Sequence, residues 1–162
     1  MESLISKQAI QALETRIQRE EFSSRLYEDM SLWFEDKGYI NLAKLYKKYS
    51  GEELTHASWS KDFLLSYKIK PCLKALGSPE SEYKSCKDIL DATLSHEAAI
   101  TKECEILATD ALKRGEITLY TLGLKYCAEQ VEELSKAYNL LDICSLTDSD
   151  LLFDQYVGEN LL

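Results

Sequence analysis

The sequence predicts an all-α protein: a bundle of four long helices with one long crossover and a short fifth helix at the C-terminal end. Three observations lead to this fold class. Four long segments repeat apolar residues at intervals of three and four positions, which is the helical period. The 162 residues include only two prolines and six glycines, so long helices can continue without interruption. The sequence shows no sustained alternation of apolar and polar residues of the kind that marks strands.

The first two predicted helices form a hairpin. The first helix extends from about Ser6 to Phe34, and the turn Asp36-Lys37-Gly38 ends it, because glycine favours the position after a helix. The second helix extends from about Tyr39 to Lys68. The expected inner positions of the two helices are Leu13, Ile17, Ser24, Tyr27, Met30, Leu42, Leu45, Tyr49, Trp59 and Phe63.

A connection from Ile69 to Cys86 follows the first hairpin. It contains Pro71 and Pro79 and is unusually long for a compact domain. A connection of this length can carry the chain along the whole bundle. We therefore expect the second and third helices to be parallel, as in bundles with one crossover.

The second hairpin is predicted from a third helix over about Lys87 to Lys113 and a fourth over about Glu116 to Ile143, joined at Arg114-Gly115. Its expected inner positions are Ile89, Thr93, Ile100, Cys104, Leu107, Ala111, Leu119, Leu122, Tyr126, Ala137 and Leu141. A short fifth helix is expected over Asp150 to Tyr156. We assign residues 1–145 to the bundle and 146–162 to a turn and fifth helix of the same domain.

The composition excludes several classes of function. A net charge of −9 argues against a nucleic-acid partner, because the chain has no excess of cations to neutralise phosphates. The five cysteines are odd in number and include no Cys-x-x-Cys, so we expect ordinary thiols in a reducing compartment. Neither a secretory leader nor a membrane-spanning segment is apparent, and a cytoplasmic location with no membrane partner is expected.

Each predicted helix directs polar side chains toward the core near its middle. These residues are Glu20 on the first helix, Glu53 and His56 on the second, Glu97 on the third, and Gln130 and Glu133 on the fourth. Glu53 follows Glu20 by 33 positions (53 − 20), and Gln130 follows Glu97 by the same interval (130 − 97). Both pairs are centred on a predicted turn, so their members stand level with each other.

Several carboxylates in one dry place repel one another unless protons or cations neutralise them. Four glutamates and one histidine can together bind two divalent metal ions, and oxygen ligands with one imidazole favour iron or manganese. The alternative is that these residues lie on the surface of a metal-free helical interaction module, in which case Glu20, Glu53 and Glu97 are exposed.

Four segments resemble the helices of non-haem bacterial ferritins, and the likeness covers nearly the whole chain. They are EFSSRLYEDMSLW from Glu21, EELTH from Glu52, SHEAAIT from Ser95 and AEQVEELSK from Ala128. The resemblance implies one iron site formed by Glu20, Glu53 and His56. It implies a second site formed by Glu97, Glu133 and a bridging Glu53.

The same resemblance assigns further residues. Gln130 is an amide that contacts iron or oxygen, or else a hydrogen-bond partner of a ligand, and Tyr27 lies beside the centre. The resemblance also implies a third iron site, formed by the carboxylates of Glu52, Glu129, Glu132 and Glu133. The alternative is that these residues form only a solvated acidic face. Leu54 stands where bacterioferritins have the methionine that binds haem, so no haem is expected. Of the remaining candidates, we expect His96 to be exposed and Trp33 and Trp59 to serve in packing.

The resemblance implies an iron-storage protein with ferroxidase activity. Iron is both its cofactor and its cargo, with two to three ions at each subunit site. Its oxidant is dioxygen or peroxide. The implied assembly is a hollow homo-oligomer of 24 subunits. The alternative within the same fold is a di-iron enzyme that reduces peroxide or dioxygen without storing iron. A DNA-protecting miniferritin is disfavoured by the predicted fifth helix.

Overall fold

The computed structural model describes residues 3–79 and 82–162, and within them every regular element is a helix. The helices are α1 (Lys7–Asp36), α2 (Ile40–Ser66), α3 (Cys86–Lys113), α4 (Ile117–Leu146) and α5 (Asp150–Asn160). The predicted all-α fold class is confirmed. The last two helices are longer than expected: α4 continues three residues beyond Ile143 and α5 four beyond Tyr156.

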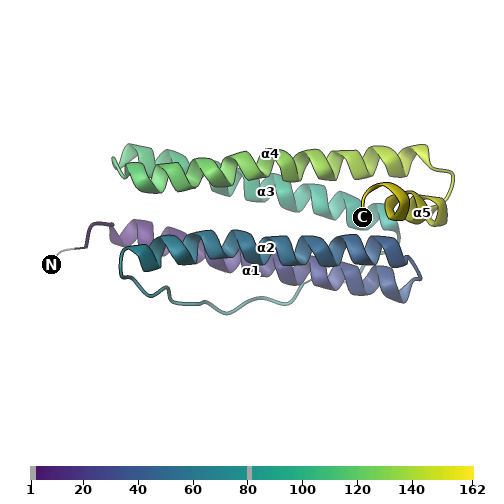
Figure 1. Ribbon diagram of the computed structural model, residues 1–162, viewed down its shortest axis with the longest axis horizontal. Helices are drawn as coiled ribbons and strands as arrows, with labels where there is room; N and C mark the ends of the chain where they lie inside the picture. The colour runs from purple at the N-terminus through teal and green to yellow at the C-terminus, as the bar shows by residue number, and fades with distance from the viewer. Residues whose placement is uncertain (1–2, 80–81) are drawn as a thin grey trace.

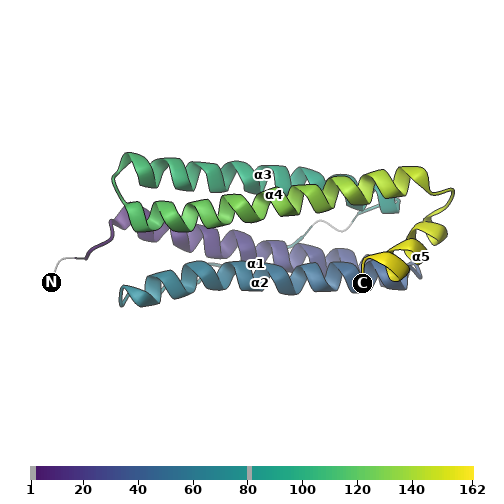
Figure 2. The same cartoon turned by 45° about the horizontal axis from the view of Figure 1, so that its top comes forward.

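Helices α1 and α2 form one antiparallel hairpin, and α3 and α4 form the other (Figure 1). The connection between the hairpins follows the length of the bundle, so that α2 and α3 are parallel, as predicted (Figures 1 and 2). This connection is fixed to α1 by hydrogen bonds. Gln18 Nε2 donates to the Ala75 carbonyl oxygen at 2.7 Å, and Trp33 Nε1 donates to the Tyr83 carbonyl oxygen at 3.2 Å. Residues 80 and 81 of the predicted connection lie outside the described residues.

Local sequence explains where most helices begin and end. Ser6, Ser85 and Ser149 cap α1, α3 and α5, each accepting a hydrogen bond from a backbone N–H three residues later. The two tight turns are closed by Gly38 and Gly115, whose φ angles of 88° and 70° favour glycine.

The start of α2 has no such local cap. Tyr39 precedes it without a side-chain hydrogen bond to the helix. Instead, Asp154 of α5 accepts a hydrogen bond from the Leu42 backbone N–H at 2.8 Å and another from Asn41 Nδ2 at 3.2 Å. Phe153 and Val157 are fully buried beside it, so α5 both packs against the bundle and completes the N-terminus of α2.

The apolar core is divided into two clusters along the bundle. The cluster nearest the α1–α2 turn includes Met30, Phe34, Leu42, Tyr46, Ile89, Leu140 and Phe153. The cluster at the other end includes Leu13, Ile17, Leu64, Ile100, Leu107 and Leu119. Trp33 packs against the first cluster and Trp59 against the second, as expected. Polar side chains from all four long helices lie between the clusters, where each helix has its predicted polar positions.

Among the described residues, no helix combines the length and apolar composition that a membrane crossing requires.

Candidate metal centre

The polar region between the two apolar clusters contains the predicted ligands. It is formed by Glu20 from α1, Glu53 and His56 from α2, Glu97 from α3, and Gln130 and Glu133 from α4, none of which is more than 6% exposed. The helical period predicts this convergence, because residues three and four apart share a face. The exposure of Glu20, Glu53 and Glu97 that a metal-free interaction module predicts is wrong, since these carboxylates are buried.

Glu20, Glu53 and His56 form one group of potential metal ligands. Their ligand atoms all lie within 4.8 Å of one another. His56 Nδ1 lies 3.1 Å from Glu53 Oε2 and 3.8 Å from Glu20 Oε2. Two carboxylates and one imidazole are thus close enough to share a single ion.

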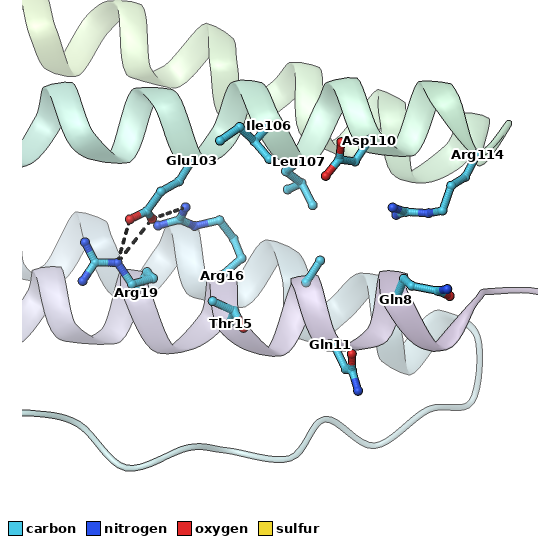
Figure 3. Close-up of a pocket in the computed structure, with 11 residues that line it drawn as sticks. Gln8, Gln11, Thr15, Arg16, Arg19, Glu103, Ile106, Leu107, Asp110 and Arg114 are labelled. Carbon is cyan, nitrogen blue, oxygen red and sulfur yellow. Dashed lines mark hydrogen bonds and ion pairs between the residues drawn. The ribbon is translucent and has the colours of Figure 1, made fainter.

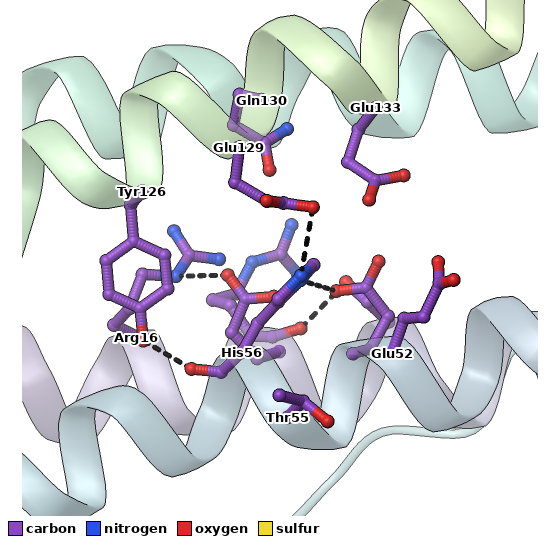
Figure 4. A network of polar contacts seen from close by, with 12 residues as sticks. Arg16, Glu52, Thr55, His56, Tyr126, Glu129, Gln130 and Glu133 are labelled. Carbon is purple, nitrogen blue, oxygen red and sulfur yellow. Dashed lines mark hydrogen bonds and ion pairs between the residues drawn. The ribbon is translucent and has the colours of Figure 1, made fainter.

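A second group with the same spacing is formed by Glu53, Glu97 and Glu133. Glu53 belongs to both groups, so its carboxylate lies between two possible ion positions. A third group joins His56 and Glu133 to Glu129, whose Oε1 lies 3.3 Å from His56 Nε2 (Figure 4). Overlapping groups of this kind fit two neighbouring divalent ions better than one isolated ion.

Both oxygens of the Glu97 carboxylate have hydrogen-bond donors. The Tyr27 hydroxyl donates to Oε1, and Gln130 Nε2 donates to Oε2 at 2.9 Å. Burial, together with the nearby charge of Glu97, raises the pKa of Tyr27 well above its ordinary value, so the phenol keeps its proton. Tyr27 and Gln130 therefore hold Glu97 in position.

Burial changes the protonation of the other carboxylates. It raises the pKa of Glu53 to about 8, and the charges of Glu97 and Glu133 act in the same direction. It raises the pKa of Glu133 to about 7. It also raises the pKa of Glu20, although the nearby guanidinium of Arg16 opposes this shift. Glu53 and Glu133 are thus poised to exchange protons for a metal cation near neutral pH.

Arg16 connects the centre to the surface. This side chain is only 4% exposed, and its Nε lies 2.9 Å from Glu20 Oε1. Its Nη1 donates to Glu103 Oε2 at 3.0 Å, and Glu103 also accepts a hydrogen bond from Arg19. Arg16, Arg19 and Glu103 line a cleft of about 620 Å³ between α1 and α3 (Figure 3). A chain of polar contacts through Arg19, Glu103 and Arg16 therefore extends from this cleft to Glu20.

The carboxylates that the resemblance assigns to a third iron are not brought together as a set. Glu129 lies beside His56, but Glu132 is exposed and belongs to no potential ligand group among the described residues. Between Glu52 and Glu133 lies the ammonium group of Lys136, at 3.1 Å from an oxygen of each.

The prediction that His96 is exposed is wrong. Its ring is partly buried, its Nε2 lies 2.7 Å from Ser23 Oγ, and it packs edge-on against Tyr27. Burial lowers the pKa of His96 to about 4, so the ring is neutral. Its position next to the inner face of α3 suggested exposure, but α1 covers that side of the helix.

The contacts of Arg16 and Lys136 with the carboxylates of the centre are not among those predicted from the sequence. Each carries a cation into the centre: Arg16 precedes Glu20 by four residues, and Lys136 follows Glu133 by three. Basic residues three or four positions from an inner carboxylate lie on the same face of the helix. This spacing is the feature of the sequence that indicates the two contacts.

The comparison with known protein families agrees with this geometry. Residues 10–147 match the family model described as "Ferritin-like domain". The chain belongs to the ferritin-like domain family. The match covers all four long helices of the bundle except the first residues of α1, and it includes every ligand candidate.

Relatives of this ferritin-like chain have similar lengths. It is 26% identical over 159 residues to the "Probable bacterial non-heme ferritin-like protein" of Haemophilus influenzae, covering 96% of each chain. It is 27% identical over 143 residues to a "Bacterial non-heme ferritin" of Escherichia coli, covering 88% of this chain and 87% of that one. Among solved structures, the open pore ferritin of Archaeoglobus fulgidus superposes with a TM-score of 0.91 at 28% identity, covering 95% of this chain and 98% of that one. The resemblance to non-haem bacterial ferritins and the four-helix ferritin-like fold are therefore confirmed.

Proposed function

We propose that this protein is an iron-storage ferritin with ferroxidase activity. It binds Fe(II) within each subunit, oxidises it to Fe(III) and deposits the product inside a hollow oligomer in the cytoplasm. The observation that carries this proposal is the shared position of Glu53, which lies in two groups of buried ligand atoms at once. Membership in the ferritin-like family and the ferritin relatives support the same function.

Two Fe(II) ions are the substrates of the proposed centre. Glu20, Glu53 and His56 bind the first ion, and Glu53, Glu97 and Glu133 bind the second. Each ion gives up one electron. The pair therefore supplies the two electrons that reduce dioxygen to peroxide, or peroxide to water.

The chain's own residues neutralise and orient the metals. Binding of each ion releases protons from buried carboxyl groups, because burial favours the protonated form of Glu53 at neutral pH and a bound cation favours the ionised form. Tyr27 and Gln130 keep Glu97 directed toward the second ion through their two hydrogen bonds. A fixed set of anionic oxygens favours Fe(III) over Fe(II), since the more highly charged ion gains more from it.

The proposed assembly has 24 subunits. Subunits of 18.5 kDa give a particle of about 444 kDa (24 × 18.5) before any mineral is added. The likeness to the Archaeoglobus fulgidus ferritin, at a TM-score of 0.91, supports a subunit shape suited to such an assembly.

The test is anaerobic addition of Fe(II), followed by oxygen, with iron counted per chain after gel filtration. Storage predicts many more than two irons per chain in a particle near the expected mass. A small oligomer that turns over peroxide and retains about two irons per chain would instead identify a di-iron enzyme that stores no mineral.

Variants of the centre provide the second part of this test. We expect Glu20→Ala and His56→Ala to abolish the fast phase of Fe(II) oxidation while the particle stays assembled, because both residues lie inside one subunit. The matched control is Glu105→Ala, which removes an exposed glutamate of α3. Oxidation rates in the two centre variants that equal those of the control would eliminate the proposed centre.

A further inference from the structure

Lys136 of α4 lies at the edge of the proposed centre, between carboxylates from two helices. Its Nζ donates to Glu52 Oε2 of α2 at 3.1 Å and to Glu133 Oε1 of α4 at 3.1 Å. The ammonium also lies 5.3 Å from the centroid of the Tyr49 ring, a position that favours a cation. Three neighbours from two helices therefore fix one positive charge at this point.

The Lys136 side chain stays charged at neutral pH. Two carboxylate oxygens lie at hydrogen-bond distance from its ammonium group, and such neighbours favour the charged form. A fixed ammonium at this point is a cation that cannot diffuse away.

We propose that Lys136 is a tethered cation that occupies the position between Glu52 and Glu133 and so limits each subunit to two tightly bound metal ions. The inference rests on the proposed function and specifies how many metal ions its site accepts. A divalent ion placed between these two carboxylates would meet the ammonium at close range, where like charges repel strongly.

Lys136 also engages one oxygen of a proposed metal ligand. Its hydrogen bond engages Glu133 Oε1, which leaves Oε2 for the ion shared with Glu53 and Glu97. Glu20 and Glu53 make no contact with Lys136 in the described structure. Each metal position therefore has one carboxylate that also contacts a cation of the chain, Glu20 with Arg16 and Glu133 with Lys136.

The experiment is a titration of the metal-free protein with Co(II) under nitrogen, with bound ions counted by equilibrium dialysis and their ligand field followed by visible absorption. Co(II) accepts the same oxygen and nitrogen ligands and stays divalent. We expect two tight ions per chain in the natural protein. We expect three in Lys136→Met, which keeps much of the length of the side chain and removes the charge.

Three further variants separate charge from packing. Lys136→Arg keeps the charge and is expected to bind two ions. The double variant Lys136→Met with Glu52→Gln removes a ligand of the new position and is expected to return to two. Lys125→Met is the matched control on the same helix, because the Lys125 ammonium lies over the Trp59 ring at 4.1 Å, and it too is expected to bind two.

Several results would overturn the proposal. One is a count of two in Lys136→Met with unchanged affinities, and another is three tight ions in the natural protein. Glu52→Gln alone offers a test that does not depend on the folding of Lys136→Met. It leaves the count at two if Lys136 holds Glu52, and lowers the count if Glu52 itself binds metal.

The failure of the proposed function has a different signature. A natural protein that binds no Co(II), or whose count is unchanged by Glu20→Ala, would eliminate the metal centre together with the role of Lys136. A natural protein that binds two ions and stores iron, with a Lys136→Met variant that also binds two, would eliminate the role of Lys136 alone.

Discussion

Replacing Arg16 with methionine tests whether the metal-free centre depends on a cation of its own. The Arg16 guanidinium is 4% exposed and lies 2.9 Å from a Glu20 carboxylate that is 1% exposed. Removal of one partner from a buried ion pair leaves a buried charge without compensation, which costs about 3–5 kcal/mol. Glu20 can take up a proton in response, so we expect a loss near the lower limit, about 3 kcal/mol in the free energy of unfolding.

The measurement is urea unfolding of the metal-free protein at pH 7 and one fixed protein concentration, because an oligomer's stability depends on concentration. Arg19→Met is the matched control. Arg19 is 32% exposed and contacts the same Glu103, so its loss is expected to cost about 0–1 kcal/mol. Combining Arg16→Met with Glu20→Gln removes the unpaired charge, and this double variant is expected to regain part of the lost stability.

The reasoning is refuted if Arg16→Met unfolds at the same urea concentration as Arg19→Met. It is also refuted if the double variant is less stable than Arg16→Met alone. Saturating Co(II) gives an independent check. A metal ion supplies the positive charge that Glu20 has lost, so it is expected to stabilise Arg16→Met more than it stabilises the natural protein.

Two further predictions concern pH and packing. Burial raises the pKa of Glu53 to about 8 and of Glu133 to about 7, from an ordinary value of 4.5. At pH values between the ordinary pKa and these raised values, the two groups are protonated in the folded chain and ionised in the unfolded chain. Thermal unfolding is therefore expected to show that the metal-free protein loses stability from pH 5 to pH 8, by at most about 1.4 kcal/mol per pH unit for each group. A gain in stability over this range would contradict the prediction. Gly123→Ala places a Cβ 2.9 Å from Ala108 of the facing helix and is expected to lower the free energy of unfolding by about 1–2 kcal/mol, after a helix-propensity gain of about 1 kcal/mol. Gly51→Ala, where the Cβ meets open space, should instead gain about 1 kcal/mol, and equal urea midpoints for the two variants would refute the packing argument.

Most of the candidate centre can be predicted from the sequence because its ligands lie on long, uninterrupted helices. The helical period decides that Glu53 and His56 share a face, and the equal intervals about the two turns decide that Glu20 and Glu97 stand level with their hairpin partners. These are local properties of the chain, so no knowledge of packing is needed to derive them.

Contacts between helices are less predictable. His96 lies one position away from the inner face of α3, yet Ser23 and Tyr27 of α1 cover it. Asp154 lies on a short helix 112 residues from Leu42 in the sequence, and only the docking of α5 makes it a cap for α2. Neither contact follows from a periodic pattern, since each depends on the rotation of one helix against another.

The sequence by itself determined the helices, the level of the acidic residues along the bundle and the side on which they lie, because backbone geometry fixes these from residue spacing. The tertiary structure alone decided which carboxylate oxygens meet and which are already engaged. Arg16 and Lys136 place permanent positive charges against Glu20 and Glu133, and the balance between those charges and incoming metal depends on distances of a few ångströms. Electrostatic energy varies steeply over such distances in a buried site, whereas sequence spacing does not specify them.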